Sequence, residues 1–182
     1  MTRSVFDRTK INDLELKNRI VRSATWEGLG NHDGSVNDAL VGVYRELADG
    51  GVGLIISGYL AIRPEGRQHV TQLLIHDDSM IPGLARIAEA VHERGGKIVG
   101  QIVHCGGQAV RDAAGTRPYA PSAVASPGYA ELPEELSTDD INTLIAGFAN
   151  AARRLKIAGF DGVQLHGAHG YLLAQFLSPA RN

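Results

Sequence analysis

The sequence predicts an α/β fold with a parallel sheet. It favours a (β/α)8 TIM barrel in which this chain supplies an N-terminal hairpin and roughly the first four strand–helix units. Strand-like and helix-like segments alternate along the chain, which is typical of parallel strands with crossover helices outside. The strand-like segment at residues 52–62 is almost continuously apolar, as strands buried on both faces are. A whole barrel needs about 200 residues or more, whereas this chain has 182.

The first segments predict a hairpin and then one strand–helix unit. Two strand-like pieces flank Asn12-Asp13 within residues 5–18, which favours a small hairpin covering one end of the sheet. Residues 19–25 are rich in apolar and β-branched residues and read as a strand. Residues 35–51 have apolar residues at helical spacing and end at two glycines, which predicts a helix. Its inner face is expected to contain Leu40, Val43, Tyr44 and Leu47.

The second unit combines a buried strand with a capped helix. Residues 52–62 are nearly all apolar and predict the strand. Residues 79–96 predict the helix, with Asp78 or Ser79 as its N-cap and Gly95-Gly96 at its end. Its apolar stripe is expected to contain Ile81, Leu84, Ala88 and Val91.

The third strand and the longest helix are separated by an irregular segment. Residues 97–104 predict the strand, and residues 105–136 show no periodicity, which is typical of a functional loop. Residues 137–159 predict the helix, because Ser137 and Asp140 have the spacing of a capping box. Its inner face is expected to contain Ile141, Leu144, Ile145, Phe148, Ala152 and Leu155.

The last predicted strand covers residues 161–167, and residues 171–177 begin a further helix. An open doubly wound sheet is the competing architecture, but the turn "WEGLGNHDGS" after the first strand lacks the G-x-G-x-x-G pattern of that fold. Four units of a barrel leave edge strands unpaired and an apolar face uncovered. We therefore expect a fragment, or a chain that must pair.

Composition excludes several classes of protein. The net charge of −2 and the pI near 6.4 give no basic surface for nucleic acid or an anionic membrane. No apolar run approaches the roughly 18 residues of a membrane span, and the N-terminal residues lack the apolar core of a signal peptide. The single cysteine, Cys105, permits no internal disulfide. We expect a cytoplasmic protein that acts on a small molecule.

Reactive side chains are expected where the strands end, because barrel enzymes place their sites at the carboxyl ends of strands. The segment "HGAHGY" follows the fourth strand and contains His166, His169 and Tyr171. Two histidines can donate hydrogen bonds to one substrate oxygen, and a neutral phenol can supply a proton. Gln101 lies inside the third strand, where a buried amide needs a partner. Either a neighbouring strand or the edge of a planar ligand would provide one.

A metal site is the alternative use of the two histidines. Only His104 and Glu27 are plausible additional ligands, and no carboxylate cluster accompanies them. A metal-dependent hydrolase using His104, His166 and His169 is therefore the weakest hypothesis, and we expect no metal.

The segment "GFDGVQLHGAHGYLLAQFLSPARN" closely resembles the signature of the old yellow enzyme family, the NADH:flavin oxidoreductases. The pieces "LKNRIVRSATWEG", "GVGLIISGYLAIRPEGR", "GGKIVGQIVHCGGQA" and "YAPSAV" match the family in the same order, so the resemblance covers essentially the whole chain. It implies a (β/α)8 barrel that binds FMN and takes electrons from NADH or NADPH. It also implies ene-reductase activity, the reduction of activated alkenes such as enones or enoyl thioesters.

The resemblance assigns roles to residues that match the motifs. It implies that His166 and His169 hydrogen-bond the carbonyl or nitro oxygen of the substrate. Hydride then passes from flavin N5 to the β-carbon, and Tyr171 protonates the α-carbon from the opposite face. The residues implied to bind the flavin are Ala24 and Thr25 against the ring system, Gly58 and Tyr59 near its polar edge, and Gln101 at the pyrimidine edge.

Two positions depart from the family pattern. Trp26 stands where many relatives have threonine or cysteine near the flavin O4, and tryptophan cannot accept a hydrogen bond there. Gly107 replaces the arginine of the H-x-G-R pattern. "SATWEG" resembles the branch of 2,4-dienoyl-CoA reductase and trimethylamine dehydrogenase, so an iron–sulfur cluster is expected only in sequence downstream of residue 182.

The family's second half supplies the later strands, an arginine near flavin N1 and the loops that hold the FMN phosphate. We therefore expect residues 1–182 to be the N-terminal half of one flavin-binding domain, with weak or no FMN binding alone. Its expected partners are the missing C-terminal half or further copies of itself. The alternative is a truncated, flavin-free half-barrel that acts as a structural or interaction fragment without catalysis.

Overall fold

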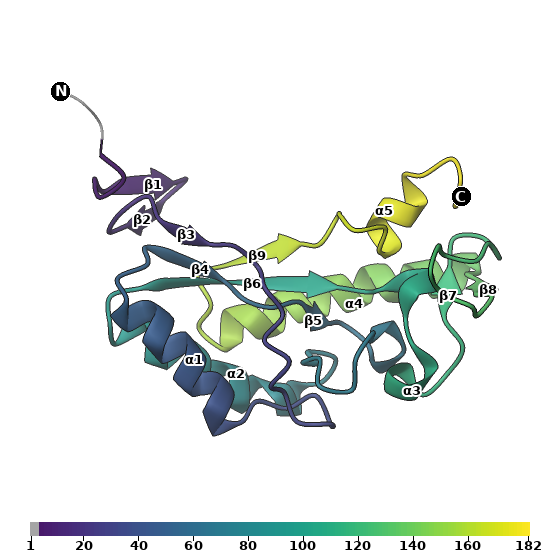
Figure 1. Cartoon of the computed structure of the whole chain (residues 1–182), viewed down its shortest axis with the longest axis horizontal. Helices are drawn as coiled ribbons and strands as arrows, with labels where there is room; N and C mark the ends of the chain where they lie inside the picture. The colour runs from purple at the N-terminus through teal and green to yellow at the C-terminus, as the bar shows by residue number, and fades with distance from the viewer. Residues whose placement is uncertain (1–3) are drawn as a thin grey trace.

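The computed structural model describes residues 4–182, and its main sheet is parallel. The spatial order of the strands is β3, β4, β6 and β9, with β5 following β4 along the same side of β6 (Figure 1). The strands are β3 (Val21–Arg22), β4 (Leu54–Ile56), β5 (Leu60–Ala61), β6 (Lys97–Val103) and β9 (Gly162–Leu165).

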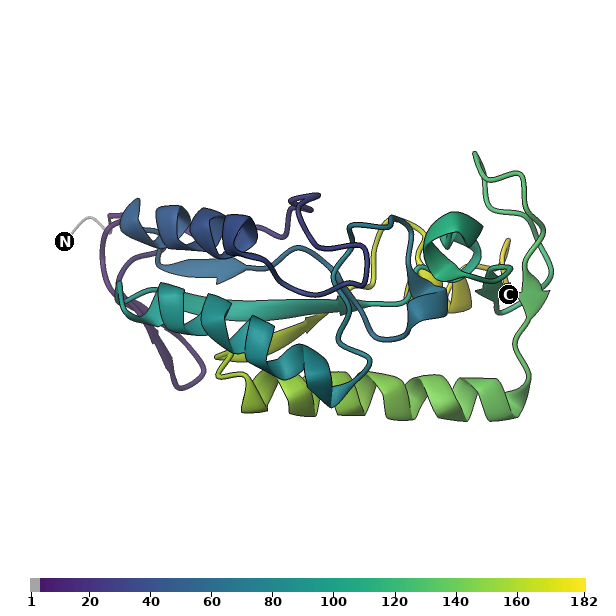
Figure 2. The same ribbon diagram turned by 90° about the horizontal axis from the view of Figure 1, so that it is seen from below.

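The long helices lie along the outside of this sheet. They are α1 (Asp38–Asp49), α2 (Ile81–His92) and α4 (Thr138–Ile157). Helix α1 packs against α2, and α2 packs against α4, so that the helices follow the strands around an arc (Figure 2). This is the arrangement expected of part of a (β/α) barrel.

The predicted hairpin is present. Strands β1 (Thr9–Ile11) and β2 (Leu14–Leu16) are antiparallel, and Asn12 turns the chain between them with a φ of 52°. The hairpin lies at the end of the sheet where the parallel strands begin (Figure 1). Strand β3 is shorter than the predicted 19–25, because only Val21 and Arg22 pair with β4 before the chain leaves the sheet.

Helix α1 is capped by Asn37, whose Oδ1 accepts the Leu40 N–H at 3.0 Å. Its predicted inner face is correct at Leu40 and Tyr44, which are buried. Val43 and Leu47 are only half-buried, and the other buried positions are Val41 and Ala48. Helix α1 packs against α2, and its buried residues belong to the same core cluster as Ile55 of β4.

The predicted second strand is interrupted at residues 57–59. Ser57 still pairs with β6 through its N–H and the carbonyl of Val99. Gly58 instead directs its N–H to the side chains of Glu27 and Tyr44. The interruption brings Gly58 and Tyr59 to the end of the sheet where the candidate site lies.

The cap predicted for α2 is wrong. The helix is preceded by a 3₁₀ turn, η2 (Asp78–Met80), and the side chain of Asp77 caps that turn by accepting the Ser79 N–H at 2.9 Å. The tighter turn begins earlier than an α-helix would, so the cap falls one residue before Asp78. Within α2, Leu84, Ala88 and Val91 are buried as predicted.

Helix α4 has the predicted capping box between Ser137 and Asp140. Leu144 and Leu155 are buried as predicted, but the position predicted for Ile145 is wrong, since its exposed fraction is 62%. Ile145 belongs to an apolar groove between α4 and α5 (Leu172–Phe176) rather than to the interface with the sheet.

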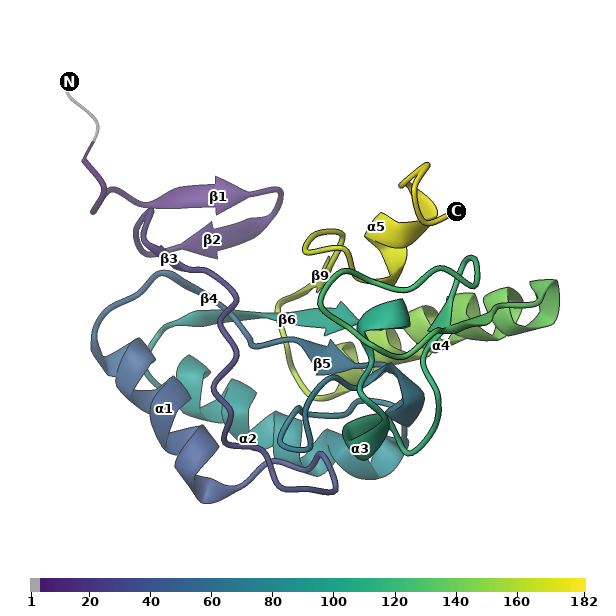
Figure 3. The ribbon, with the colours of Figure 1, turned by 45° about the vertical axis from the view of Figure 1, so that its right-hand side comes forward.

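The segment 105–136 contains short elements that its composition did not predict. They are η3 (Gly106–Gln108), α3 (Arg111–Ala114) and the two-stranded parallel sheet of β7 (Tyr119–Ala120) and β8 (Glu134–Glu135). A further 3₁₀ turn, η1 (Pro64–Gly66), follows β5. These elements lie at the end of the sheet toward which the strands point (Figure 3).

Both edges of the sheet carry exposed apolar residues, as expected for part of a barrel. Val21 on β3 and Val163 on β9 are exposed, and the exposed fraction of Leu165 is 58%. None of the helices among residues 4–182 combines the length and the apolar character that crossing a membrane requires.

Candidate active site

The residues predicted to be functional lie where the parallel strands end. His166, His169 and Tyr171 follow β9, Gly58 and Tyr59 follow β4, and residues 23–27 follow β3. The segment 105–136 folds over the same end of the sheet (Figure 3).

His166, His169 and Tyr171 form one cluster of rings. The ring centroid of His166 lies 5.0 Å from that of His169 and 4.8 Å from that of Tyr171. The ring centroids of His169 and Tyr171 are 6.0 Å apart. The turn that brings them together has a left-handed residue, His169 with a φ of 57°, followed by Gly170 with a φ of 71°. His166 and Tyr171 are buried, and His169 is exposed.

The hydrogen bonds of His166 define its tautomer. Its Nδ1 accepts the N–H of Ala168 at 3.3 Å, so the proton of the neutral ring is on Nε2. Burial lowers the pKa of His166, and the adjacent His169 lowers it further. The ring is therefore neutral near pH 7 and offers an Nε2–H donor.

Tyr171 is a neutral phenol held by other polar side chains. Burial raises its pKa to about 12. Its hydroxyl donates to Gln68 Oε1 at 2.8 Å, and the hydroxyl of Tyr59 reaches the same oxygen at 3.2 Å. The rings of Tyr59 and Tyr171 lie nearly parallel, with centroids 5.9 Å apart. Sequence reasoning missed Gln68, since no local pattern links it to the fourth strand.

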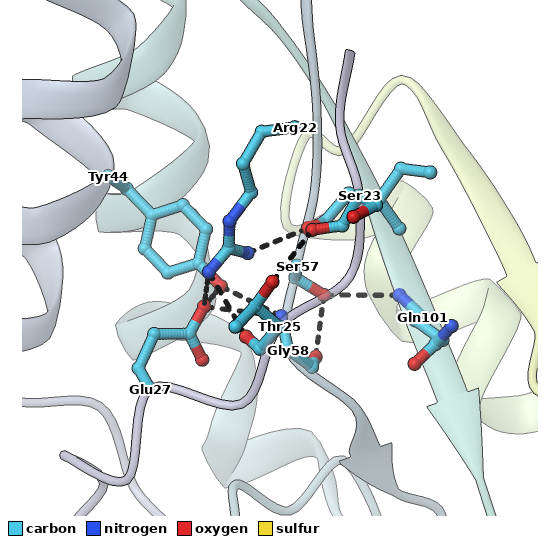
Figure 4. Close-up of polar contacts among 9 residues, drawn as sticks. Arg22, Ser23, Thr25, Glu27, Tyr44, Ser57, Gly58 and Gln101 are labelled. Atoms are coloured by element: carbon cyan, nitrogen blue, oxygen red, sulfur yellow. Dashed lines mark hydrogen bonds and ion pairs between the residues drawn. The ribbon is translucent and has the colours of Figure 1, made fainter. Parts of the chain in front are cut away.

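The buried side-chain amide of Gln101 has its hydrogen-bond partner on the neighbouring strand β9. Its Nε2 donates to Gln164 Oε1 on β9 at 2.8 Å. Its backbone N–H donates to Ser57 Oγ at 3.1 Å (Figure 4). The internal network was one of the two partners predicted for this residue. The bond to Gln164 uses one of the two Nε2 hydrogens, so the other hydrogen and the amide oxygen of Gln101 remain to meet a ligand.

A second polar network fixes the ends of β3 and β4 (Figure 4). Glu27 Oε1 accepts hydrogen bonds from Arg22 at 3.0 Å, from the Tyr44 hydroxyl at 2.6 Å and from the Gly58 N–H at 3.3 Å. Arg22 also donates to the carbonyls of Ile56 and Thr25. Sequence reasoning considered Glu27 only as a metal ligand and missed Arg22 and Tyr44.

The residues before Glu27 form an accessible surface. Ala24 is half-buried, and Thr25 is exposed with its hydroxyl donating to the Ser23 carbonyl at 3.2 Å. The exposed fraction of Trp26 is 40%, although its ring stacks on His69. Beside His169, a cavity of about 440 Å³ is lined by residues that include Gln108, Ser126 and Arg181.

His104 lies apart from this cluster. It is completely buried, its Nδ1 accepts the Gly106 N–H at 3.0 Å, and burial lowers its pKa to about 4. Across residues 4–182, no three histidine, cysteine, aspartate or glutamate side chains are grouped so as to hold a metal ion.

Comparison with known proteins gives one consistent result. The model of the NADH:flavin oxidoreductase / NADH oxidase family matches residues 4–182. The chain is 42% identical over 181 residues to an NADH oxidase of Thermoanaerobacter brockii, a match that covers 98% of this chain and 28% of the relative. The chain thus spans less than a third of that relative.

Two solved structures superpose closely on the chain. A 2-naphthoyl-CoA reductase complex superposes with a TM-score of 0.93 at 30% sequence identity. The match covers 98% of this chain and 29% of the reductase chain. The old yellow enzyme homologue from Zymomonas mobilis superposes with a TM-score of 0.91 at 31% sequence identity. The match covers 99% of this chain and 53% of the homologue. These superpositions confirm the predicted architecture, in which the chain forms part of a (β/α) barrel.

Proposed function

The chain belongs to the NADH:flavin oxidoreductase / NADH oxidase family, and from that premise we propose that it supplies the substrate-polarising and proton-donating part of an FMN-dependent reductase. The proposed substrates are activated alkenes, such as enones or enoyl thioesters, and the reductant is NADH or NADPH. The single buried cysteine, Cys105, supports a cytoplasmic location.

The convergence of His166, His169 and Tyr171 carries this proposal. A carbonyl or nitro oxygen placed near both imidazoles would accept hydrogen bonds from them, which draws electron density away from the conjugated double bond. His166 is suited to this role because its Nε2 carries the proton. Tyr171, whose ring is 4.8 Å from that of His166, would then give its phenolic proton to the α-carbon.

Several residues support a flavin at the same place. Gln101 would present its amide oxygen to the pyrimidine edge, and Ala24 and Thr25 would provide a surface for the ring. Gly58 and Tyr59 would lie near the polar edge, with Gly58 contributing shape rather than a donor, since its N–H is already bonded. FMN, when bound, supplies the hydride for the β-carbon.

The cavity beside His169 supports a substrate that extends beyond its reacting bond. Its volume of about 440 Å³ and its polar side chains would accommodate the remainder of a thioester or a similar polar group. The 2-naphthoyl-CoA reductase is a structural relative whose ligand is such a thioester.

A flavin-free half-barrel that associates with a second copy is the second candidate function. The exposed Val163 and Leu165 on the edge strand β9 favour it. It predicts a dimer without flavin, which sedimentation equilibrium would detect.

The test begins with the purified chain, incubated with FMN and then desalted. Retained flavin absorbance, bleached by NADH or NADPH without oxygen and restored by a cyclic enone, is the expected result. Flavin that is retained and reduced but not reoxidised by the enone would contradict alkene reduction. A colourless protein that sediments as a dimer would favour the second candidate.

A further inference from the structure

We infer that Gln68 is a positioning residue for Tyr171, and that its side-chain amide holds the phenol in place and donates a hydrogen bond to the oxygen after the proton has left. This inference rests on the proposed function and names a residue outside the segment after β9. In the proposed step the O–H bond of Tyr171 breaks and a C–H bond forms at the α-carbon. Hydride from flavin reduced by NADH or NADPH forms the bond at the β-carbon, and the O–H electron pair stays on the phenol oxygen.

The amide of Gln68 contacts three phenols. Its Oε1 lies 2.8 Å from the hydroxyl of Tyr171 and 3.2 Å from that of Tyr59, and its Nε2 bonds to the hydroxyl of Tyr129. A carbonyl oxygen has two lone pairs, so one amide can serve both phenols on that side. Tyr129 belongs to the segment 105–136, so the Gln68 amide links that segment to Tyr171.

The peptide that carries Gln68 is fixed on several sides. The N–H of Gln68 donates to Gln72 Oε1 at 2.7 Å. On the preceding residues, the carbonyl of Arg67 accepts the Val110 N–H at 3.0 Å, and the carbonyl of Gly66 accepts the Cys105 N–H at 3.0 Å. The backbone that carries the Gln68 amide is therefore fixed by contacts that do not involve Tyr171, as the support of a positioning group must be.

The amide can serve the phenol before and after proton transfer. With its oxygen toward Tyr171, it accepts the O–H of the neutral phenol. Rotation by half a turn places its NH2 group there, which frees the O–H for the substrate and then stabilises the phenolate. The Tyr129 hydroxyl tolerates both orientations, because a hydroxyl can donate or accept.

The surroundings of Tyr171 make such a donor necessary. Burial and the nearby Cys105 and Tyr129 raise the pKa of Tyr171, whereas its hydrogen bonds with Tyr59 and Gln68 lower it. The imidazoles of His166 and His169 also face the Tyr171 ring, with centroids 4.8 Å and 6.0 Å away. The phenolate would be stabilised by hydrogen bonds to its oxygen, of which the amide of Gln68 supplies one.

The experiment is a fluorine NMR titration of the 182-residue chain labelled with 3-fluorotyrosine. The chain has five tyrosines, so each resonance can be assigned with a Tyr→Phe variant. Ring fluorination lowers every phenol pKa and brings the titration into a milder pH range. Gln68→Leu removes the amide, and Gln68→Glu keeps its shape but replaces the donor by an anion. The resonance of Tyr119, on β7, reports whether each variant is folded.

Gln68→Leu is expected to raise the pKa of Tyr171 by about one unit, a tenfold change in the equilibrium. Gln68→Glu should raise it further, because the carboxylate repels the phenolate. A Tyr171 titration that is unchanged in both variants, with Tyr119 unperturbed, would overturn the inference.

The second measurement uses protein loaded with FMN. Gln68→Leu should slow reoxidation of the flavin by an enone at least about tenfold and leave its reduction by NADH unchanged. A positioned general acid accelerates a reaction by about 10²–10⁴-fold, and the loss should be part of that factor. Equal loss of both half-reactions, or unchanged reoxidation, would also overturn the inference. Wild-type protein that never reacts with the enone would contradict the proposed function, while the titration would still decide whether Gln68 supports the phenolate.

Discussion

The indole of Trp26 lies face to face with the imidazole of His69, with ring centroids 4.2 Å apart and planes inclined by 14°. The edge of Tyr59 meets the same indole at 6.5 Å. The chain beside Trp26 is fixed, because Glu27 is bonded to Arg22, Tyr44 and Gly58. Trp26 is therefore an exposed but immobile aromatic surface at the end of β3, suited to contact a planar ligand.

The emission of Trp26 should report the protonation of His69. Burial lowers the pKa of His69, so the protonated ring forms only below its usual pKa of about 6.5. A protonated imidazole quenches a stacked indole, and emission should rise with pH through a midpoint below that value. Trp26 is the single tryptophan, so steady-state fluorescence measures it directly. His69→Phe should abolish the step, and a step that survives in this variant would assign it to another group.

Tyr171→Phe in FMN-loaded protein should slow reoxidation of the flavin by an alkene about 10²–10⁴-fold. Reduction of the flavin by NADH or NADPH should stay nearly unchanged. The phenyl ring keeps the packing against Tyr59 and His166 but has no proton to give. Anaerobic stopped-flow absorbance separates the two half-reactions. Tyr119→Phe, on β7, is the matched control and should affect neither. Equal losses in both half-reactions for Tyr171→Phe would refute its role as proton donor.

Glu27→Gln should lower the free energy of unfolding by about 3 kcal/mol, because it leaves Arg22 without its charged partner in a mostly buried site. The exposed fractions of the two side chains are 15% for Arg22 and 7% for Glu27. Urea denaturation measures the change, and the double variant Arg22→Met, Glu27→Gln should lose less than the sum of the single variants.

Lys10→Met provides the control for this ion pair. Lys10 and Glu15 form a pair whose side chains are 63% and 66% exposed, and such pairs contribute about 1 kcal/mol or less. Similar losses for Glu27→Gln and Lys10→Met would show that the Arg22–Glu27 pair is not effectively buried.

The parts of the site that could be predicted from the sequence are the local ones. His166, His169 and Tyr171 lie within six residues of one another, so a single turn after β9 brings them together whatever the rest of the chain does. The capping box of α4 is local in the same way. The cap before α2 was predicted at Asp78 or Ser79 but lies at Asp77, because a 3₁₀ turn precedes the α-helix.

The contacts that could not be predicted join distant segments. Gln68 and Tyr171 are 103 positions apart, and Gln101 and Gln164 are 63 apart. The Gln101–Gln164 pair depends on the register of β6 with β9, in which these two residues are directly paired. Register and loop path are set by packing of the whole domain, which no short pattern in one sequence encodes.

Gly58→Ala should destabilise the chain by about 1–3 kcal/mol, since a Cβ at this position overpacks the site. That Cβ would lie 2.2 Å from Glu27 Oε2 and 3.0 Å from the Thr25 carbonyl oxygen. Gly42→Ala is the matched control, because a Cβ there meets nothing within 4 Å in the interior of α1 and should stabilise the helix by about 0.5–1 kcal/mol. Urea denaturation measures both variants. Because Trp26 adjoins Glu27, Gly58→Ala should also shift its emission, whereas Gly42→Ala should not. A stable Gly58→Ala protein with unchanged emission would mean that Glu27 moves freely, and that the network at the end of β3 does not fix the site.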